Sequence, residues 1–219
     1  MGANKRPIPR FAPSAGAAEI LRAALSRGGD PWPEFAARFA GYLGVAHAVP
    51  APSAREALAA ILGSLGLPKG GDVLMPALTF HSIPTVVRRC GFEVGFVDID
   101  PGTLCLDAKF LKGAMKPGTV AILPVHLHGR AADMDAISEL SRRYGLAVIE
   151  DCAQAAGGMY GGRRLGGFGD AAFFSFHPAK NLSALWAGMA VTGRSDVAAG
   201  VESAMASHPL ISLIELAGP

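Results

Sequence analysis

The stretch FFSFHPAKN, residues 173–181, carries apolar residues through a histidine and a proline to Lys180. From residue 117 to the C-terminus the chain has six arginines but only this one lysine. Lysine differs from arginine because its amine loses a proton when it is desolvated and then attacks a carbonyl carbon. Lys180 could therefore act as a Schiff-base nucleophile, although its position alone favours an ordinary surface lysine in a loop.

Asp151 stands where a second strand is predicted to end. The letters IED follow the apolar run AVI, so the Asp151 carboxylate is expected at the mouth of a sheet. Such a residue often caps the next helix or turn. A carboxylate beside a pyridine nitrogen, however, keeps that nitrogen protonated, and the protonated ring accepts electrons from a carbanion. A lysine and an aspartate on neighbouring strand ends are what a pyridoxal phosphate site requires, and both interpretations remain open.

A helix start in PSAREALAAIL, residues 52–62, is a candidate phosphate cradle. Ser53 can serve as the N-cap, with Glu56 three residues later completing a capping box. The free N–H groups at a helix start bind anions, although most helix starts bind no ligand. Ser175 could add a hydroxyl from the strand that leads to Lys180.

Short apolar runs alternate with amphipathic segments along most of the chain. This pattern predicts an α/β fold, a three-layer αβα arrangement with a mostly parallel sheet of about seven strands. The predicted strands are 46–49, 72–76, 93–99, 120–126, 146–152, 171–177 and 188–193, and the predicted helices lie near 33–43, 53–65, 81–90, 107–115, 132–143 and 194–206. The glycine-rich interval between 152 and 171 has no helical period, and a long irregular segment of this kind is usually functional.

Composition narrows the possible functions. The 219 residues are 50% hydrophobic and 17% charged, with a net charge of +2, so a sizeable core is expected and disorder is not. Lys and Arg are scattered, which argues against nucleic-acid binding, and no apolar run is long enough for a membrane span. Three cysteines without metal-ligand spacing favour a reduced, cytoplasmic setting. His126 and His128 form an H-x-H pair, but no further ligands accompany them and no metal site is expected.

Six stretches together resemble the DegT/DnrJ/EryC1/StrS family of sugar aminotransferases, within fold type I of the pyridoxal phosphate enzymes. They are FAGYLGVAHAV, GDVLMPALTFHS, FVDIDPGTLCLD, ILPVHLHGRAADMDAI, GLAVIEDCAQAAGGMYGGRRLGGFGDAAFFSFHPAKNL and GMAVTG. The resemblance covers most of residues 33–193, and IEDCAQA followed by GDAAFFSFHPAKNL is its most specific part. It implies a cofactor-binding large domain at 31–206, preceded by an N-terminal arm and helix at 1–30 and followed by an unassigned tail at 207–219.

The resemblance also assigns roles to single residues. Lys180 matches the lysine that binds the cofactor covalently and moves the proton, and Asp151 matches the partner of the pyridine nitrogen. Gln154 matches the glutamine that faces the ring and its phenolic oxygen, Phe80 the stacking aromatic, and Ser175 the phosphate-binding serine. The family implies pyridoxal 5'-phosphate as cofactor, a keto sugar attached to a nucleotide as acceptor, glutamate as amino donor, and a homodimer.

The chain departs from the family pattern in three places. Ala54-Arg55 replaces the usual Gly-Thr at the phosphate helix start, so Arg55 either pairs with the phosphate or points to solvent. The segment ALWAGMAV is one residue shorter than usual and contains Trp186, and the family's small C-terminal domain is not found in this sequence. These departures leave an alternative open, namely a degenerate domain that binds cofactor, ligand or a partner subunit without turnover.

Overall fold

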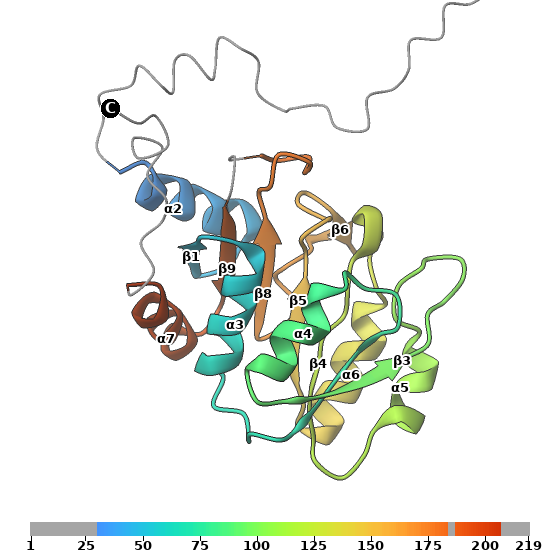
Figure 1. The fold of residues 1–219 in the computed structure, drawn as a ribbon. Helices are drawn as coiled ribbons and strands as arrows, with labels where there is room; N and C mark the ends of the chain where they lie inside the picture. The colour runs from blue at the N-terminus through green and yellow to red at the C-terminus, as the bar shows by residue number, and fades with distance from the viewer. Residues whose placement is uncertain (1–29, 184–186, 207–219) are drawn as a thin grey trace, which may run out of the picture.

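The computed structural model describes residues 30–183 and 187–206 (Figure 1). Apart from Asp30, the predicted N-terminal arm and helix at 1–30 lie outside the described residues, as do Trp186 and the tail at 207–219. The division into domains predicted from the sequence therefore stays a prediction. None of the described helices combines the length and the apolar character needed to cross a membrane.

Seven strands form the central sheet in the order β1-β9-β8-β5-β4-β2-β3. Their bounds are β1 (His47–Ala51), β2 (Asp72–Pro76), β3 (Glu93–Val97), β4 (Thr119–Ile122), β5 (Ala147–Asp151), β8 (Ala171–Ser175) and β9 (Gly188–Thr192). Only β9 runs antiparallel to its neighbours, β1 and β8. The predicted α/β fold with a mostly parallel sheet is confirmed, and the carboxyl ends of six strands meet along one edge.

Helices cover both faces of this sheet (Figure 1). The helices α3 (Ala54–Ser64), α4 (Ser82–Arg89) and α7 (Ser195–Ala206) share one hydrophobic core with the sheet. The helices α2 (Trp32–Leu43), α5 (Ala108–Ala114) and α6 (Met134–Tyr144) pack on the opposite face. The predicted three-layer arrangement follows, because each helix buries one apolar stripe and the sheet offers two apolar faces.

The alternation of side chains along β8 shows how the faces are assigned. Ala171 and Phe173 belong to the core under α3, whereas Ala172 and Phe174 belong to the core under α2. Successive side chains of a strand point to opposite faces, so Ser175 faces the α3 side.

The same rule separates two neighbours at the end of β5. Ile149 lies in the core under α3 and Val148 in the core on the other face. Asp151 therefore points to the α3 side, and Glu150 points to the α2 and α6 side. The two acidic side chains of the IED motif thus point to opposite faces of the sheet.

The glycine-rich interval is less irregular than its sequence suggests. It contains a two-stranded hairpin of β6 (Met159–Tyr160) and β7 (Arg163–Arg164), which the absence of periodicity did not predict. A short 3₁₀ turn, η1 (Leu127–Gly129), follows the end of β4. The Phe168 ring packs against the Tyr160 ring in a T-shaped arrangement. The Arg163 guanidinium lies over the same Phe168 ring, 4.5 Å from its centroid.

Candidate active site

The residues predicted to do chemistry lie at the carboxyl edge of the sheet. Asp151 ends β5, Ser175 ends the neighbouring strand β8, and both face α3. Lys180 follows β8 in a turn in which its N–H donates to the His177 carbonyl, 2.8 Å away. The sheet therefore brings the proposed amine, carboxylate and hydroxyl to the same edge, as the strand order requires.

The Asp151 carboxyl group is buried and short of hydrogen-bond donors. Its residue is 4% exposed, and within the described part of the chain the carboxylate accepts one hydrogen bond, from the Ala153 N–H at 2.9 Å. Burial raises the pKa of Asp151 to about 6, while the Ala153 N–H and the charge of Lys180 oppose the rise only in part. A buried carboxylate with so few donors has room for a cationic partner.

Lys180 is half-buried, and burial lowers the pKa of its amine, although the charge of Asp151 opposes that change. Each of the two groups influences the pKa of the other, so they are close enough to interact. The amine loses its proton more easily than that of an exposed lysine. This is the property that a nucleophilic lysine needs.

A cradle for an anion is built where β1, β9 and β8 meet. Gly188 of β9 pairs with Ala51 on one side and with Ser175 on the other. A Cβ on Gly188 would lie 2.4 Å from both the Ala54 nitrogen and the Ser53 carbonyl carbon. Only a glycine lets the start of α3 approach the strand so closely.

The start of α3 keeps free donors beside this glycine. Ser53 is confirmed as the N-cap, because its Oγ accepts from the Glu56 N–H at 3.3 Å. The Glu56 carboxylate accepts from the Ser53 hydroxyl at 2.6 Å, not from the Ser53 backbone N–H as the predicted capping box requires. Among the described residues, the N–H groups of Ala54 and Arg55 and the hydroxyl of Ser175 have no partner. The Arg55 side chain is exposed. These free donors fit a phosphate group.

Gln154 is held by an unusual backbone conformation. His128 adopts the left-handed region with φ 54° and ψ 30°, and its N–H donates to the Gln154 Oε1 at 3.3 Å. The amide oxygen is thereby engaged, and the amide nitrogen is the end of Gln154 that can donate to a ligand. This fits the predicted contact of Gln154 with a phenolic oxygen.

Phe80 follows β2 at the same edge of the sheet. Its residue is 55% exposed, and its ring centroid lies 4.4 Å from that of His81. On either side, the hydroxyl oxygens of Thr79 and Ser82 are buried without a partner in the part of the chain that the structure describes. An exposed ring flanked by unsatisfied hydroxyls is compatible with the predicted stacking role, which stays a prediction.

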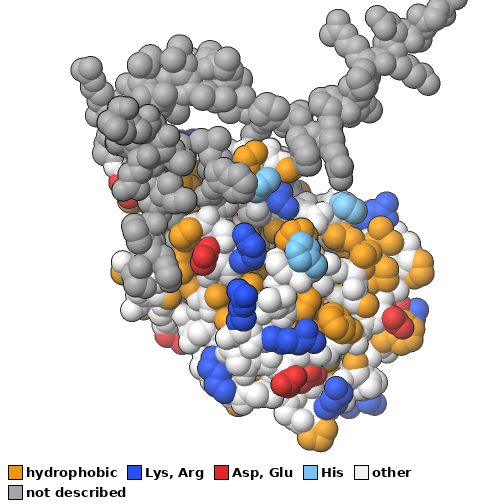
Figure 2. Space-filling view, in the orientation of Figure 1, with side chains coloured by type: hydrophobic (Ala, Val, Ile, Leu, Met, Phe, Trp, Pro, Cys, Tyr) orange, Lys and Arg blue, Asp and Glu red, His pale blue; other side chains and the backbone are white. Residues whose placement is uncertain are grey.

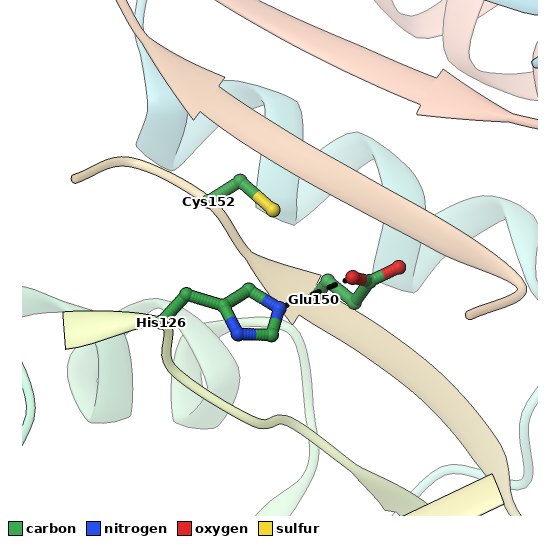
Figure 3. Close-up of side chains that lie close together, drawn as sticks. All are labelled: His126, Glu150 and Cys152. Atoms are coloured by element: carbon green, nitrogen blue, oxygen red, sulfur yellow. Dashed lines mark hydrogen bonds and ion pairs between the residues drawn. The ribbon is translucent and has the colours of Figure 1, made fainter. Parts of the chain in front are cut away.

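A second constellation, on the opposite face, was not predicted from the sequence. His126, Glu150 and Cys152 bring one ligand-type atom each to within 4.8 Å of one another (Figure 3). The two histidines of the H-x-H pair do not lie together, because His126 is buried and His128 is exposed. The partners of Glu150 lie 16 to 19 residues later in the glycine-rich interval, where no sequence period points to them.

Two surface hollows, of about 610 and 700 Å³, lie beside α2. Neither is lined by Lys180 or Asp151, so the candidate site is identified by its residues and not by a cavity. On the face that carries α3 and α4, Lys and Arg side chains are spaced between hydrophobic and neutral ones, with few Asp or Glu (Figure 2). That distribution presents no obstacle to an anionic ligand.

The chain is similar to known proteins over most of its own length. GDP-perosamine synthase of Caulobacter vibrioides is 42% identical over 166 residues, which are 76% of this chain and 45% of that protein. The crystal structure of DesI in the presence of its TDP-sugar product matches with a TM-score of 0.77 and 38% identity, covering 85% of this chain and 48% of that one. Bacillus subtilis NtdA with bound cofactor PMP matches with a TM-score of 0.74 and 33% identity, covering 84% and 42%.

The chain thus spans less than half the length of each of these proteins. The model of the DegT/DnrJ/EryC1/StrS aminotransferase family matches residues 14–209, which include every residue assigned to the candidate site. The chain belongs to the DegT/DnrJ/EryC1/StrS aminotransferase family.

Proposed function

We propose that this chain forms the cofactor-binding part of a pyridoxal phosphate-dependent aminotransferase that acts on a keto sugar attached to a nucleotide, with glutamate as amino donor. The observation that carries the proposal is the placement of a half-buried Lys180 and a buried, donor-poor Asp151 at the same sheet edge, where each influences the pKa of the other. A relative named for a GDP-linked compound and a structure obtained with a TDP-sugar product support the substrate class. The neighbour with bound PMP supports the cofactor.

The residues present fit this cofactor. The free N–H groups of Ala54 and Arg55 and the Ser175 hydroxyl would hold its phosphate beside Gly188. Asp151 would hold its pyridine nitrogen, and that nitrogen would supply the cation that the buried carboxylate lacks. When bound, the cofactor supplies an electron sink for a carbanion next to the reacting nitrogen.

The chain's own contribution is binding, orientation and proton transfer. Lys180, whose pKa burial lowers, takes up and returns the proton at its Nζ atom. Gln154, fixed through its oxygen by the His128 N–H, directs its amide nitrogen toward the ligand. Phe80 would cover one face of the ring.

The test is a covalent adduct at one lysine. The purified chain is mixed with pyridoxal phosphate, its visible absorbance is recorded, and borohydride reduction followed by peptide mass spectrometry locates the adduct. We expect a visible band and an adduct on Lys180, both lost in Lys180→Ala and both kept in Lys116→Ala, which alters an exposed lysine. A wild-type chain with neither band nor adduct would remove the proposal.

A second reaction separates turnover from binding alone. Adding glutamate to the loaded chain should abolish the visible band as the amino group is transferred, and a nucleotide-linked keto sugar should restore it. A stable band that neither compound changes would favour the alternative function, a domain that binds the cofactor without turnover. The exposed Arg55 in place of the family's usual threonine is the feature that favours this alternative.

A further inference from the structure

A buried hydrogen-bond network lies on the face of the sheet opposite the candidate site, and Figure 3 shows its side chains His126 and Glu150 with the neighbouring Cys152. His126 and Glu150 are both fully buried, and their Nε2 and Oε2 atoms are 3.1 Å apart. The N–H of Ala132 donates to His126 Nδ1 at 3.2 Å. Because Nδ1 accepts, Nε2 is the ring nitrogen that donates to Glu150.

Glu150 has a full set of donors without any ion. Besides His126, it accepts from the backbone N–H groups of Gly166 (2.8 Å), Phe168 (2.7 Å) and Gly169 (2.8 Å). Nearby Cys152 is buried too, and burial together with the charges of Glu150 and Asp151 raises the pKa of its thiol well above the ordinary value. Each Glu150 carboxylate oxygen already accepts two hydrogen bonds, so the cluster is complete as a hydrogen-bond network.

This network reaches the active-site face through the backbone. β4 pairs with β5 at Ala121 and Ile122, and an isolated parallel bridge between Val125 and Asp151 continues this pairing in the same register. The Asp151 N–H donates to the Pro124 carbonyl at 2.9 Å, and the His126 N–H donates to the Asp151 carbonyl at 3.0 Å. The N–H and the carbonyl group of Asp151 are therefore both bonded to the short segment that His126 terminates.

We propose that His126 is a positioning residue for Asp151: its ring, fastened to Glu150 and Ala132, fixes the segment that aligns the Asp151 backbone and hence its carboxylate. The proposal rests on the proposed function, because Asp151 is taken as the cofactor's partner. One parallel bridge joins the segment to Asp151, and the buried bonds of the His126 ring to Glu150 and Ala132 hold the end of the segment next to that bridge. The bond between His126 and Glu150 also connects this segment to the glycine-rich interval, because Glu150 accepts hydrogen bonds from that interval.

Three substitutions at this position separate the hydrogen bond from the space the ring fills. Glutamine can place its amide nitrogen where His126 Nε2 lies and keep the donor to Glu150. Asparagine is too short to reach Glu150, and leucine fills space but donates nothing. We expect His126→Gln to bind pyridoxal phosphate within about threefold of wild type, and His126→Asn and His126→Leu to bind it about tenfold or more weakly.

His47 provides the matched control. Its Nε2 atom lies 3.0 Å from the Ser195 hydroxyl, and it pairs with Thr192 at the opposite end of the sheet. His47→Gln and His47→Leu alter an exposed histidine hydrogen bond to a hydroxyl without touching the segment beside Asp151. Both should bind the cofactor as wild type does. Affinity is measured by titrating the visible band at a temperature at which circular dichroism shows every variant folded.

Each outcome of these titrations either supports or overturns the positioning role of His126. Weaker binding of pyridoxal phosphate by His126→Asn and His126→Leu, together with near wild-type binding by His126→Gln, supports the positioning role. Wild-type affinity in the folded His126→Asn and His126→Leu variants overturns it. The positioning role is also overturned if all three variants lose the same affinity for pyridoxal phosphate, or if the loss of affinity follows the volume of the new side chain. If wild type binds no cofactor, the proposed function fails, and hydrogen exchange of the Asp151 amide decides instead: faster exchange in Asn and Leu but not in Gln supports positioning, and unchanged exchange refutes it.

Discussion

Glu150 and Asp151 are consecutive residues at the end of β5, and both carboxyl groups are buried, but they lie on opposite faces of the sheet in opposite environments. Burial raises the pKa of Glu150, but the hydrogen bond from His126 and the N–H groups of Gly169 and Gly166 outweigh it, and the pKa falls below its ordinary value. Asp151 accepts one hydrogen bond among the described residues, and its pKa rises to about 6.

The difference shows how one short motif can serve both structure and function. A buried carboxylate that the protein itself saturates is an anchor, because removing it leaves buried donors unpaired. A buried carboxylate with too few donors costs stability until a cation from a ligand reaches it. The two α3-side serines repeat the contrast: the Ser53 hydroxyl is used within its helix, and the Ser175 hydroxyl has no partner in the described part of the chain.

The largest effect is expected from Glu150→Gln. An amide nitrogen cannot accept, so at least one of the N–H donors or His126 would face another donor. Breaking a buried charged network from one side costs about 3–5 kcal/mol of unfolding free energy, measurable by urea denaturation. A loss below about 1 kcal/mol would contradict the anchor role.

The pH dependence of this variant has a definite sign. The folded-state pKa of Glu150 lies below the ordinary 4.5, so its stabilisation is complete above that pH and is lost as the pH falls through the folded-state pKa. The gap between wild type and Glu150→Gln should therefore be widest at neutral pH and shrink in acid. The exposed Glu139, altered to Gln, serves as control because it lies outside the network.

Asp151→Asn is expected to act in the opposite direction. The folded-state pKa of about 6 lies above the ordinary 3.8, so the ionised group destabilises the folded chain at neutral pH. The difference corresponds to up to roughly 3 kcal/mol, and the cofactor-free variant should be more stable than wild type by up to this amount at pH 8 and by almost nothing near pH 4. Unfolding curves at both pH values provide the measurement.

The same Asp151→Asn protein should bind pyridoxal phosphate less tightly, since an amide does not attract a protonated ring nitrogen. Higher stability together with weaker binding is the signature of a group kept for a ligand. A variant that is destabilised at pH 8 would place Asp151 with Glu150, as part of the scaffold, and would weaken the assignment of the site.

Gly188→Ala tests how closely α3 approaches the sheet on the Asp151 side. The added Cβ would meet backbone atoms of Ser53 and Ala54 that cannot rotate away. We expect a loss of about 1–3 kcal/mol in unfolding free energy and weaker binding of the cofactor phosphate. Gly193→Ala, near the other end of β9, adds a methyl with nothing within 4 Å and should change neither quantity.

Much of this arrangement follows from the sequence, for a physical reason. Apolar runs of strand length alternate with amphipathic segments, so the strands and their carboxyl edge were predicted closely, and with them the meeting of Asp151, Ser175 and the start of α3. Local capping chemistry likewise identified Ser53.

The remainder depends on contacts that no local pattern encodes. In the sequence, Glu150 is one of two consecutive acidic residues. Three of its four hydrogen-bond donors are backbone N–H groups, and a backbone group cannot be recognised from the residue type. The left-handed conformation of His128 is equally hidden, because the sequence gives no glycine there to suggest it. Sequence therefore located the functional face of β5 more readily than the face that supports it.

The smallest effects concern the two serines. Ser53→Ala removes an N-cap and should lower the unfolding free energy by about 1 kcal/mol. Ser175→Ala removes a hydroxyl without a described partner and should change it by less than about 0.5 kcal/mol. Binding of pyridoxal phosphate should reverse the order: a hydrogen bond to a charged group is worth about 1.5–3 kcal/mol, so Ser175→Ala should weaken it at least about tenfold and Ser53→Ala much less. If Ser175→Ala instead costs the greater stability and leaves binding intact, the free donors on the α3 face are structural after all.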